Sequence, residues 1–261
     1  KNTPAAPCPS GINMGLWDLA LLGVVTLQVA SIAYLPRPRW KALALSLPFP
    51  FTTIALSQSN PINTTHVLAL PVLLIYYHSI RLIHKRLPIV PSIALGMLLY
   101  IGTSKLLLGA IPITPISFWF AIGGICAIAI LLFLLQPPRR EPDHRTPLPI
   151  YLKLPTVIAV VALLLVLKES LQGFATFFPL VGVAGLYEAR KALWGVCRQA
   201  PVFVGGMCAM LATVFLVQEL LGLASALFIG WMVYLAVLWP VTSRLWTVED
   251  SFNAQAVPVK R

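Results

Sequence analysis

Long apolar stretches with very few charges are the feature that most limits what this chain can fold into. The 261 residues are 58% apolar and 10% charged, whereas soluble domains carry about 25% charged residues, so too few charged side chains exist to cover a soluble globule. Since lipid cannot hydrogen-bond the backbone, such stretches indicate membrane-spanning helices. We expect an all-α polytopic integral membrane protein with about nine transmembrane helices, at residues 16–35, 42–58, 65–83, 88–108, 116–136, 150–167, 170–188, 199–218 and 222–240.

The distribution of lysine and arginine supports this map. If successive connections alternate sides, 16 of the 19 basic residues fall on one side, and only Lys1, Lys105 and Lys168 fall on the other. Basic residues collect on the cytoplasmic side, which predicts a bacterial inner (plasma) membrane protein with its N-terminus outside and its C-terminus in the cytoplasm. The net charge of +11 would then face anionic lipid headgroups. No basic–aromatic pattern indicates nucleic acid.

The polar segment 137–149 is rich in proline and charge, and we predict that it is a cytoplasmic linker. It follows an outer N-terminal segment (1–15) and a first membrane block of five helices (16–136). A second block of four helices (150–240) and a cytoplasmic tail (241–261) come after it.

A weak internal repeat is visible across this linker. Residues 77–110 laid on 187–220 without gaps give six identities in 34 pairs, among them the glycine pair Gly96 and Gly206. This match predicts one leading helix followed by two four-helix units, which an even number of helices per unit would make parallel. Two unrelated hairpins that follow the same membrane rules remain the alternative.

Prolines inside the predicted spans are the first candidate for a functional feature. Leu47-Pro-Phe-Pro-Phe51, Pro71 and Phe177-Phe-Pro179 interrupt three segments, and proline removes a backbone donor and kinks or breaks a helix. Broken helices offer free backbone groups that transporters use as binding groups. Thr52, Thr53 and Gln58 follow the first proline pair and would line such a site. A purely structural kink is the alternative.

Charged side chains near the outer helix ends form a second candidate. Lys105, Lys168, Glu169 and Glu219 would face one another in a polar vestibule, although snorkelling to the interface explains them equally well. His78 and Glu188, near the inner ends of two helices, could relay protons, whereas an aromatic belt explains the tyrosines beside them.

Patterns typical of enzymes are missing from the sequence: it has no His-Glu-x-x-His helix, no Gly-x-Ser-x-Gly elbow and no phosphate-binding glycine loop. We therefore expect no catalytic residues, no metal and no cofactor. The predicted function is transport of a small solute or ion through a cavity between two helical repeats, by a homo-oligomer or a subunit of a membrane complex. The alternatives are a non-catalytic anchoring or scaffolding subunit and, more remotely, an enzyme acting on lipid.

Overall fold

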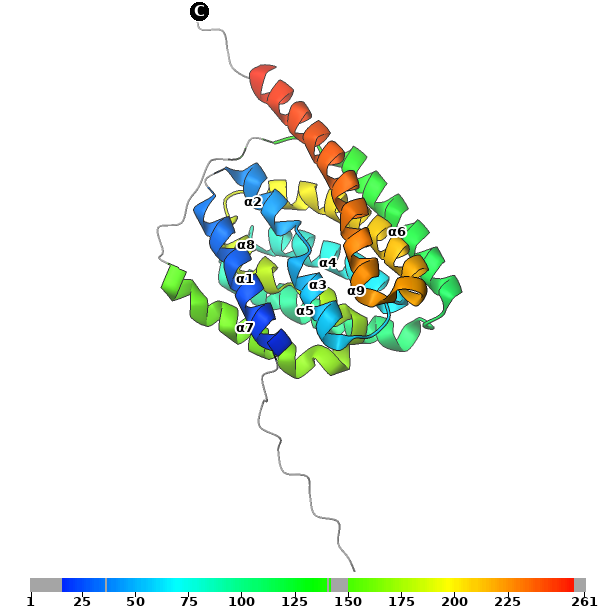
Figure 1. Cartoon of the computed structure of the whole chain (residues 1–261). Helices are drawn as coiled ribbons and strands as arrows, with labels where there is room; N and C mark the ends of the chain where they lie inside the picture. Colours follow the sequence, from blue (N-terminus) through cyan, green and yellow to red (C-terminus); the bar gives the residue numbers. More distant parts are fainter. Residues whose placement is uncertain (1–15, 36, 140, 142–149, 256–261) are drawn as a thin grey trace, which may run out of the picture.

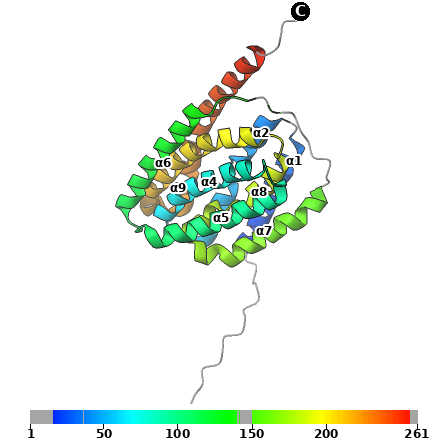
Figure 2. The same ribbon diagram turned by 180° about the vertical axis from the view of Figure 1, so that it is seen from behind.

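The computed structural model describes residues 16–35, 37–139, 141 and 150–255, and over these residues it contains helices and no strand (Figure 1). The helices are α1 (Leu16–Tyr34), α2 (Pro38–Leu45), α3 (Phe49–Gln58), α4 (Thr64–Ile83), α5 (Ile89–Ala110), α6 (Pro115–Leu135), α7 (Ile150–Leu171), the 3-10 helix η1 (Gln172–Phe177), α8 (Leu180–Glu188) and α9 (Leu193–Gln255). Seen from behind, α4 and α8 lie inside the bundle, with α6 and α7 at its two flanks (Figure 2).

Five of the described helices, α1, α4, α5, α6 and α9, are long and apolar enough to cross a membrane. The outer surfaces of these helices are themselves apolar: Leu98 on α5 is 65% exposed and Phe120 on α6 is 78% exposed. Soluble monomers rarely expose large contiguous apolar patches, so these surfaces indicate a protein embedded in lipid.

Contacts between helix ends show how the central helices run. Ile62, just before α4, donates its backbone N–H to Gln218 Oε1 at 2.8 Å and accepts from Gln218 Nε2 at 3.1 Å. Gln218 lies near the end of the first arm of α9 (193–221). At the opposite end, Cys197 Sγ, near the start of that arm, lies 3.6 Å from the carbonyl oxygen of Tyr77, in the second half of α4. The helix α4 and the first arm of α9 are therefore antiparallel.

Arginines gather at the end of the bundle where α4 ends and α9 begins, which we call the basic end. The guanidinium carbons of Arg81 and Arg139 lie 4.5 Å and 4.2 Å from the centroid of the Trp194 ring. Arg39, at the start of α2, forms an ion pair of 3.2 Å with Asp250 at the end of α9. Arginines that the sequence map assigned to one side thus share one end of the structure.

Two predicted spans, 42–58 and 170–188, are each broken near the middle. The first consists of α2 and α3, separated by residues 46–48, and the second consists of η1 and α8, separated by residues 178 and 179. Pro48 and Pro179 are the N-cap residues of α3 and α8. Since proline has no backbone N–H and its ring excludes the preceding turn, neither helix continues through it. The breaks predicted at these prolines are confirmed, whereas α4 continues through Pro71.

Two hairpins are built alike. A Cβ added to Gly96 of α5 would come within 2.7 Å of Ile80 on α4. A Cβ added to Gly230, in the second arm of α9 (223–255), would come within 2.8 Å of Val214 on the first arm. The two arms are joined at Gly222, whose φ of 75° is a conformation that glycine adopts readily. The contacts thus match α4 and α5 with the first and second arms of α9.

This correspondence differs from the one expected from sequence. The gapless match of 77–110 with 187–220 pairs α5 with the first arm of α9, whereas the glycine contacts pair α5 with the second arm. Because α4 and the first arm are antiparallel, the two hairpins are inverted relative to each other, and the contacts do not favour the parallel relation. The second arm also continues to Gln255, past residue 240, where the tail was predicted to begin.

Candidate functional site

The breaks in the two interrupted segments meet inside the bundle, at a place that we call the crossing. The rings of Phe51 from α3 and Phe177 from η1 stack with centroids 4.8 Å apart. Here α2 and η1 end and α3 and α8 begin, so two carbonyl-bearing ends and two amide-bearing ends converge. Such ends leave up to four backbone groups without partners inside each helix.

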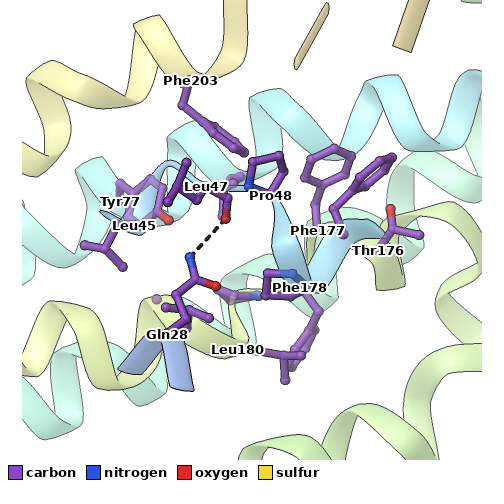
Figure 3. A pocket seen from close by; sticks show the side chains of 16 residues that line it. Gln28, Leu45, Leu47, Pro48, Tyr77, Thr176, Phe177, Phe178, Leu180 and Phe203 are labelled. Carbon is purple, nitrogen blue, oxygen red and sulfur yellow. Dashed lines mark hydrogen bonds between the residues drawn. The ribbon is translucent and has the colours of Figure 1, made fainter. Parts of the chain in front are cut away.

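A small cavity of about 50 Å³ lies at the crossing, lined by sixteen residues (Figure 3). Most of the lining is apolar, and its polar side chains are Gln28 from α1, Tyr77 from α4 and Thr176 from η1. None of the sixteen carries a charge. A water needs about 10–15 Å³ of such volume, so the cavity has room for about three to five small non-hydrogen atoms.

Gln28 satisfies the carbonyl end of α2. Its Nε2 donates to the carbonyl oxygens of Ala44 at 2.7 Å and Leu47 at 2.9 Å, and Figure 3 shows the second of these bonds. The side chain is 6% exposed, and its Oε1 has no hydrogen-bond partner among the described residues. A buried acceptor without a partner is expensive, which makes this oxygen the most unusual polar atom of the cavity.

Two tyrosines, one from each hairpin, donate hydrogen bonds to further backbone carbonyls near the crossing. Tyr100 of α5 donates its hydroxyl to the carbonyl oxygen of Phe174 in η1 at 2.8 Å. Tyr234, in the second arm of α9, donates to the carbonyl oxygen of Ser46 beyond the end of α2. Each tyrosine lies four residues after the glycine that lets its hairpin close, so the two hairpins hold the two broken segments in the same way.

The N-termini of α3 and α8 differ from these carbonyl ends. No side chain caps the N-terminus of α3 or α8 within the described part of the chain. Phe51 of α3 and Val181 and Gly182 of α8 line the cavity and stand in the first three positions of their helices, where backbone N–H groups have no partner inside the helix. Helix N-termini also carry partial positive charge, so the cavity favours a ligand with acceptor atoms.

The residues predicted after the first proline pair lie beside this cavity and do not line it. Thr52 Oγ1 donates to the Pro48 carbonyl oxygen at 3.1 Å and accepts from Trp231 Nε1 at 2.7 Å. Thr53 is buried and donates to the Phe49 carbonyl oxygen at 3.0 Å. Gln58 is the last residue of α3, away from the crossing. The predicted break is therefore present, but other residues border it.

The described residues of the predicted outer vestibule do not come together in ion pairs. Lys105 and Glu219 are both exposed, and neither forms an ion pair within the described part of the chain. This arrangement matches snorkelling at the ends of α5 and α9. The side chains of Lys168 and Glu169 lie outside the described residues.

His78 and Glu188 occupy separate environments. The ring of His78 lies against its own helix, with Nδ1 2.9 Å from the Leu74 carbonyl oxygen, and its Nε2 is 2.9 Å from Gln136 Nε2 at the end of α6. Glu188, the last residue of α8, is buried, and its carbonyl oxygen accepts from Lys41 Nζ at 3.3 Å. The structure therefore pairs His78 with Gln136, and the predicted relay with Glu188 gains no support from these contacts.

Sequence reasoning missed Gln28, Tyr100 and Tyr234. Each is a single polar residue in an apolar run, which reads as an ordinary feature of a membrane helix. One signal was available: Gly-x-x-x-Tyr occurs at Gly96–Tyr100 and again at Gly230–Tyr234.

At the basic end, Glu141 of the linker caps the N-terminus of α9. Its two carboxylate oxygens accept from the backbone N–H groups of Trp194 at 2.8 Å and Gly195 at 2.9 Å. Burial raises the pKa of Glu141 to about 7, although the two amide hydrogen bonds oppose the shift. The group therefore titrates near neutral pH.

Comparisons with protein-family models, curated proteins and solved structures find no match to this chain. The geometry of its own residues is therefore the basis on which its function can be inferred.

Proposed function

We propose that this protein transports a small solute across a membrane and that the crossing of the two broken helices is its substrate site. The observation that carries the proposal is the convergence of two helix N-termini without side-chain caps on one cavity. Irregular backbone at membrane depth is tolerated where it lines a cavity, and transporters place substrates at interrupted helices between repeats.

We further infer nine crossings of the membrane. The segments α2–α3 and η1–α8 each cross once, the two arms of α9 cross once each, and α1, α4, α5, α6 and α7 supply the remainder. On this map the basic end is cytoplasmic, the N-terminus is outside and the C-terminus is inside, as the excess of arginine there favours.

Inverted repeats follow from the same map. The unit α1 to α5 corresponds to the unit α7 to α9, with α2–α3 matching η1–α8. The matched pairs Gly96–Tyr100 and Gly230–Tyr234 support this relation. Inverted units place the site near the middle of the membrane and let it open to either side by rocking of one unit against the other.

A scaffolding subunit is the alternative function, and small residues such as Gly205, Gly206 and Gly222 would let partner helices approach closely. The space above Gly206 is filled, because a Cβ there would lie 2.8 Å from Tyr234 of the same chain. Gly205 and Gly222 have nothing within 4 Å. The surface formed by these three glycines is therefore only partly open to a partner helix, which favours the transport proposal.

Cysteine labelling tests whether water reaches the crossing. In a chain whose four native cysteines are replaced, Val181→Cys places a thiol on the cavity with little change of size. Val204→Cys is the matched control, because Val204 is fully buried and does not line the cavity. We expect small charged methanethiosulfonates to modify Val181→Cys in native membranes and to leave Val204→Cys unmodified.

Flux measurements complete the test. Proteoliposomes should pass small solutes faster than protein-free vesicles in an osmotic light-scattering assay, and modification of Val181→Cys should stop this flux. An unlabelled Val181→Cys together with flux equal to protein-free vesicles would overturn the transport proposal.

A further inference from the structure

We infer that the site takes a small monovalent oxyanion that also carries one hydrogen-bond donor, a molecule of about the size of glycolate. This inference rests on the proposed transport function and names its substrate class. Four features of the crossing lead to it: which helix ends are capped, which are open, the absence of charge among its sixteen lining residues, and the free oxygen of Gln28.

The capping pattern gives the sign of the charge. A broken-helix crossing brings both polarities together, so by itself it favours neither anions nor cations. Here the carbonyl ends already receive donors from Gln28, Tyr100 and Tyr234. At the N-termini of α3 and α8, Leu180 N–H donates to the Phe178 carbonyl oxygen at 2.7 Å and Pro50 has no N–H, whereas no side chain offers an acceptor to the amides of Phe51, Val181 and Gly182.

The lengths of the four helices that meet at the crossing strengthen this preference for an anion. The helices α3 and α8, which point their N-termini at the cavity, have 10 and 9 residues. The pieces that end there are the 8-residue α2 and the 6-residue 3-10 helix η1, whose hydrogen-bond geometry is poorer. The net field of the backbone therefore favours negative charge.

The absence of charge among the lining side chains limits the ligand to a single charge. A dianion would need a positive side chain beside it, since burial of uncompensated charge is very costly. A cation would need a carboxylate or several free carbonyls, and the sixteen described lining residues include no carboxylate. A monovalent anion on backbone N–H groups meets both conditions.

Gln28 adds a requirement that a simple anion does not meet. Its Nε2 is engaged by two carbonyls, which fixes the amide so that Oε1 lies on the side of Phe178 (Figure 3). This oxygen can only accept, and it is buried without a partner. A ligand that binds with its negative oxygens on α3 and α8 and a hydroxyl or N–H on Gln28 satisfies every open group.

Four probes of similar size separate these requirements: glycolate has both the charge and the hydroxyl, acetate has the charge alone, glycolamide has the hydroxyl without the charge, and ethanolammonium has the hydroxyl with the opposite charge. Binding is measured on the purified full-length protein as the rise in unfolding temperature with probe concentration. We expect glycolate to bind about tenfold more tightly than acetate, because one hydrogen bond to a buried acceptor is worth about that factor. Glycolamide and ethanolammonium should not bind.

A glycine pair supplies the matched variants. A Cβ on Gly182 would lie 3.2 Å from Pro179 and 3.3 Å from Tyr76, at the edge of the cavity, whereas a Cβ on Gly205 has nothing within 4 Å. Gly182→Ala should weaken glycolate binding at least tenfold, and Gly205→Ala should leave it unchanged. Because the probe series uses the unaltered protein, it gives a result even if Gly182→Ala fails to fold.

The outcomes separate the two proposals. Preference for ethanolammonium or glycolamide would overturn the anion inference and leave the transport site in place. Equal binding of acetate and glycolate would overturn the role of Gln28 Oε1. No binding by any probe overturns the substrate class, and it overturns transport as well only if Val181→Cys also stays unlabelled and no flux is seen.

Discussion

Helix N-termini at the two ends of the bundle differ from those at the crossing. Asn63 caps α4 and Thr114 caps α6, each in a reciprocal capping box, and Glu141 caps α9. Pro48 and Pro179 precede α3 and α8, and they offer no side-chain acceptor. Side-chain caps are thus present at three helices that begin at the ends of the bundle, although α2 and α5 begin there without one, and they are missing from both helices that begin inside the protein. Since uncapped buried amides destabilise a fold, their retention at the crossing favours an occupant.

The largest loss of stability from a substitution should come from removing the Gln28 side chain, which donates to the carbonyl end of α2. Gln28→Leu leaves the Leu47 carbonyl without this donor, whereas the Ala44 carbonyl keeps the backbone N–H of Leu47 at 3.4 Å. Since a buried unsatisfied group costs about 1–3 kcal/mol, we expect a loss of about 1–3 kcal/mol. Thermal unfolding in detergent measures it. Ser31→Ala is the control, because Ser31 Oγ is exposed and bonds only within α1. A Gln28→Leu protein as stable as the control would break the contrast between capped and open ends.

The cap at the basic end should make stability depend on pH. Burial raises the pKa of Glu141 to about 7 from a reference of 4.5, so the folded protein binds more protons than the unfolded chain between these values. The contribution of Glu141 to stability is then largest below about pH 4.5 and is lost as pH rises to about 7, a change of about 3.4 kcal/mol at 1.36 kcal/mol per pKa unit. Glu141→Gln should flatten this slope in unfolding curves recorded at several pH values. An unchanged slope would show that another group titrates.

The two hairpins offer the finest comparison. Tyr100→Phe and Tyr234→Phe each remove one donor from a buried carbonyl, and polar contacts in membrane proteins are worth about 0.6–1.7 kcal/mol. We expect each variant to lose about 1 kcal/mol, by equal amounts within error, in the same unfolding assay. Tyr187→Phe serves as a control, since Tyr187 makes its contact through its ring with Arg190. Unequal losses would weaken the correspondence between the two units.

Prolines and apolar run lengths made much of the fold predictable. Pro48 and Pro179 lie where the helices break, and the ends of α4, α5 and α6 fall within about two residues of the predicted spans. The sequence leaves the roles of Lys105 and Glu219 undecided, because charge near a helix end serves the interface as readily as a site. The role of Gln28 depends on which backbone carbonyls lie opposite it, which only tertiary packing determines.

If the two units are inverted repeats, as proposed, their relation is hard to find in the sequence for an electrostatic reason. The connection before α2–α3 carries Arg37 and Arg39 at the basic end, whereas the matching connection before η1 lies at the other end. The reverse holds after the breaks: residues 59–63 are uncharged, and their counterpart carries Arg190 and Lys191. Units inserted in opposite directions must differ most in their charged loops, so sequence comparison finds little in common between them.

The single helix α6 has a consequence for how such a chain is threaded. A four-helix unit returns the polypeptide to the face where it started, so two copies joined directly would insert in the same sense. On the proposed map one additional pass between them reverses the second copy, and α6, at one flank of the bundle (Figure 2), would supply that pass. If the proposed topology is right, deletion of α6 would place the arginines of the second unit on the opposite face of the membrane or leave one hairpin outside the bilayer.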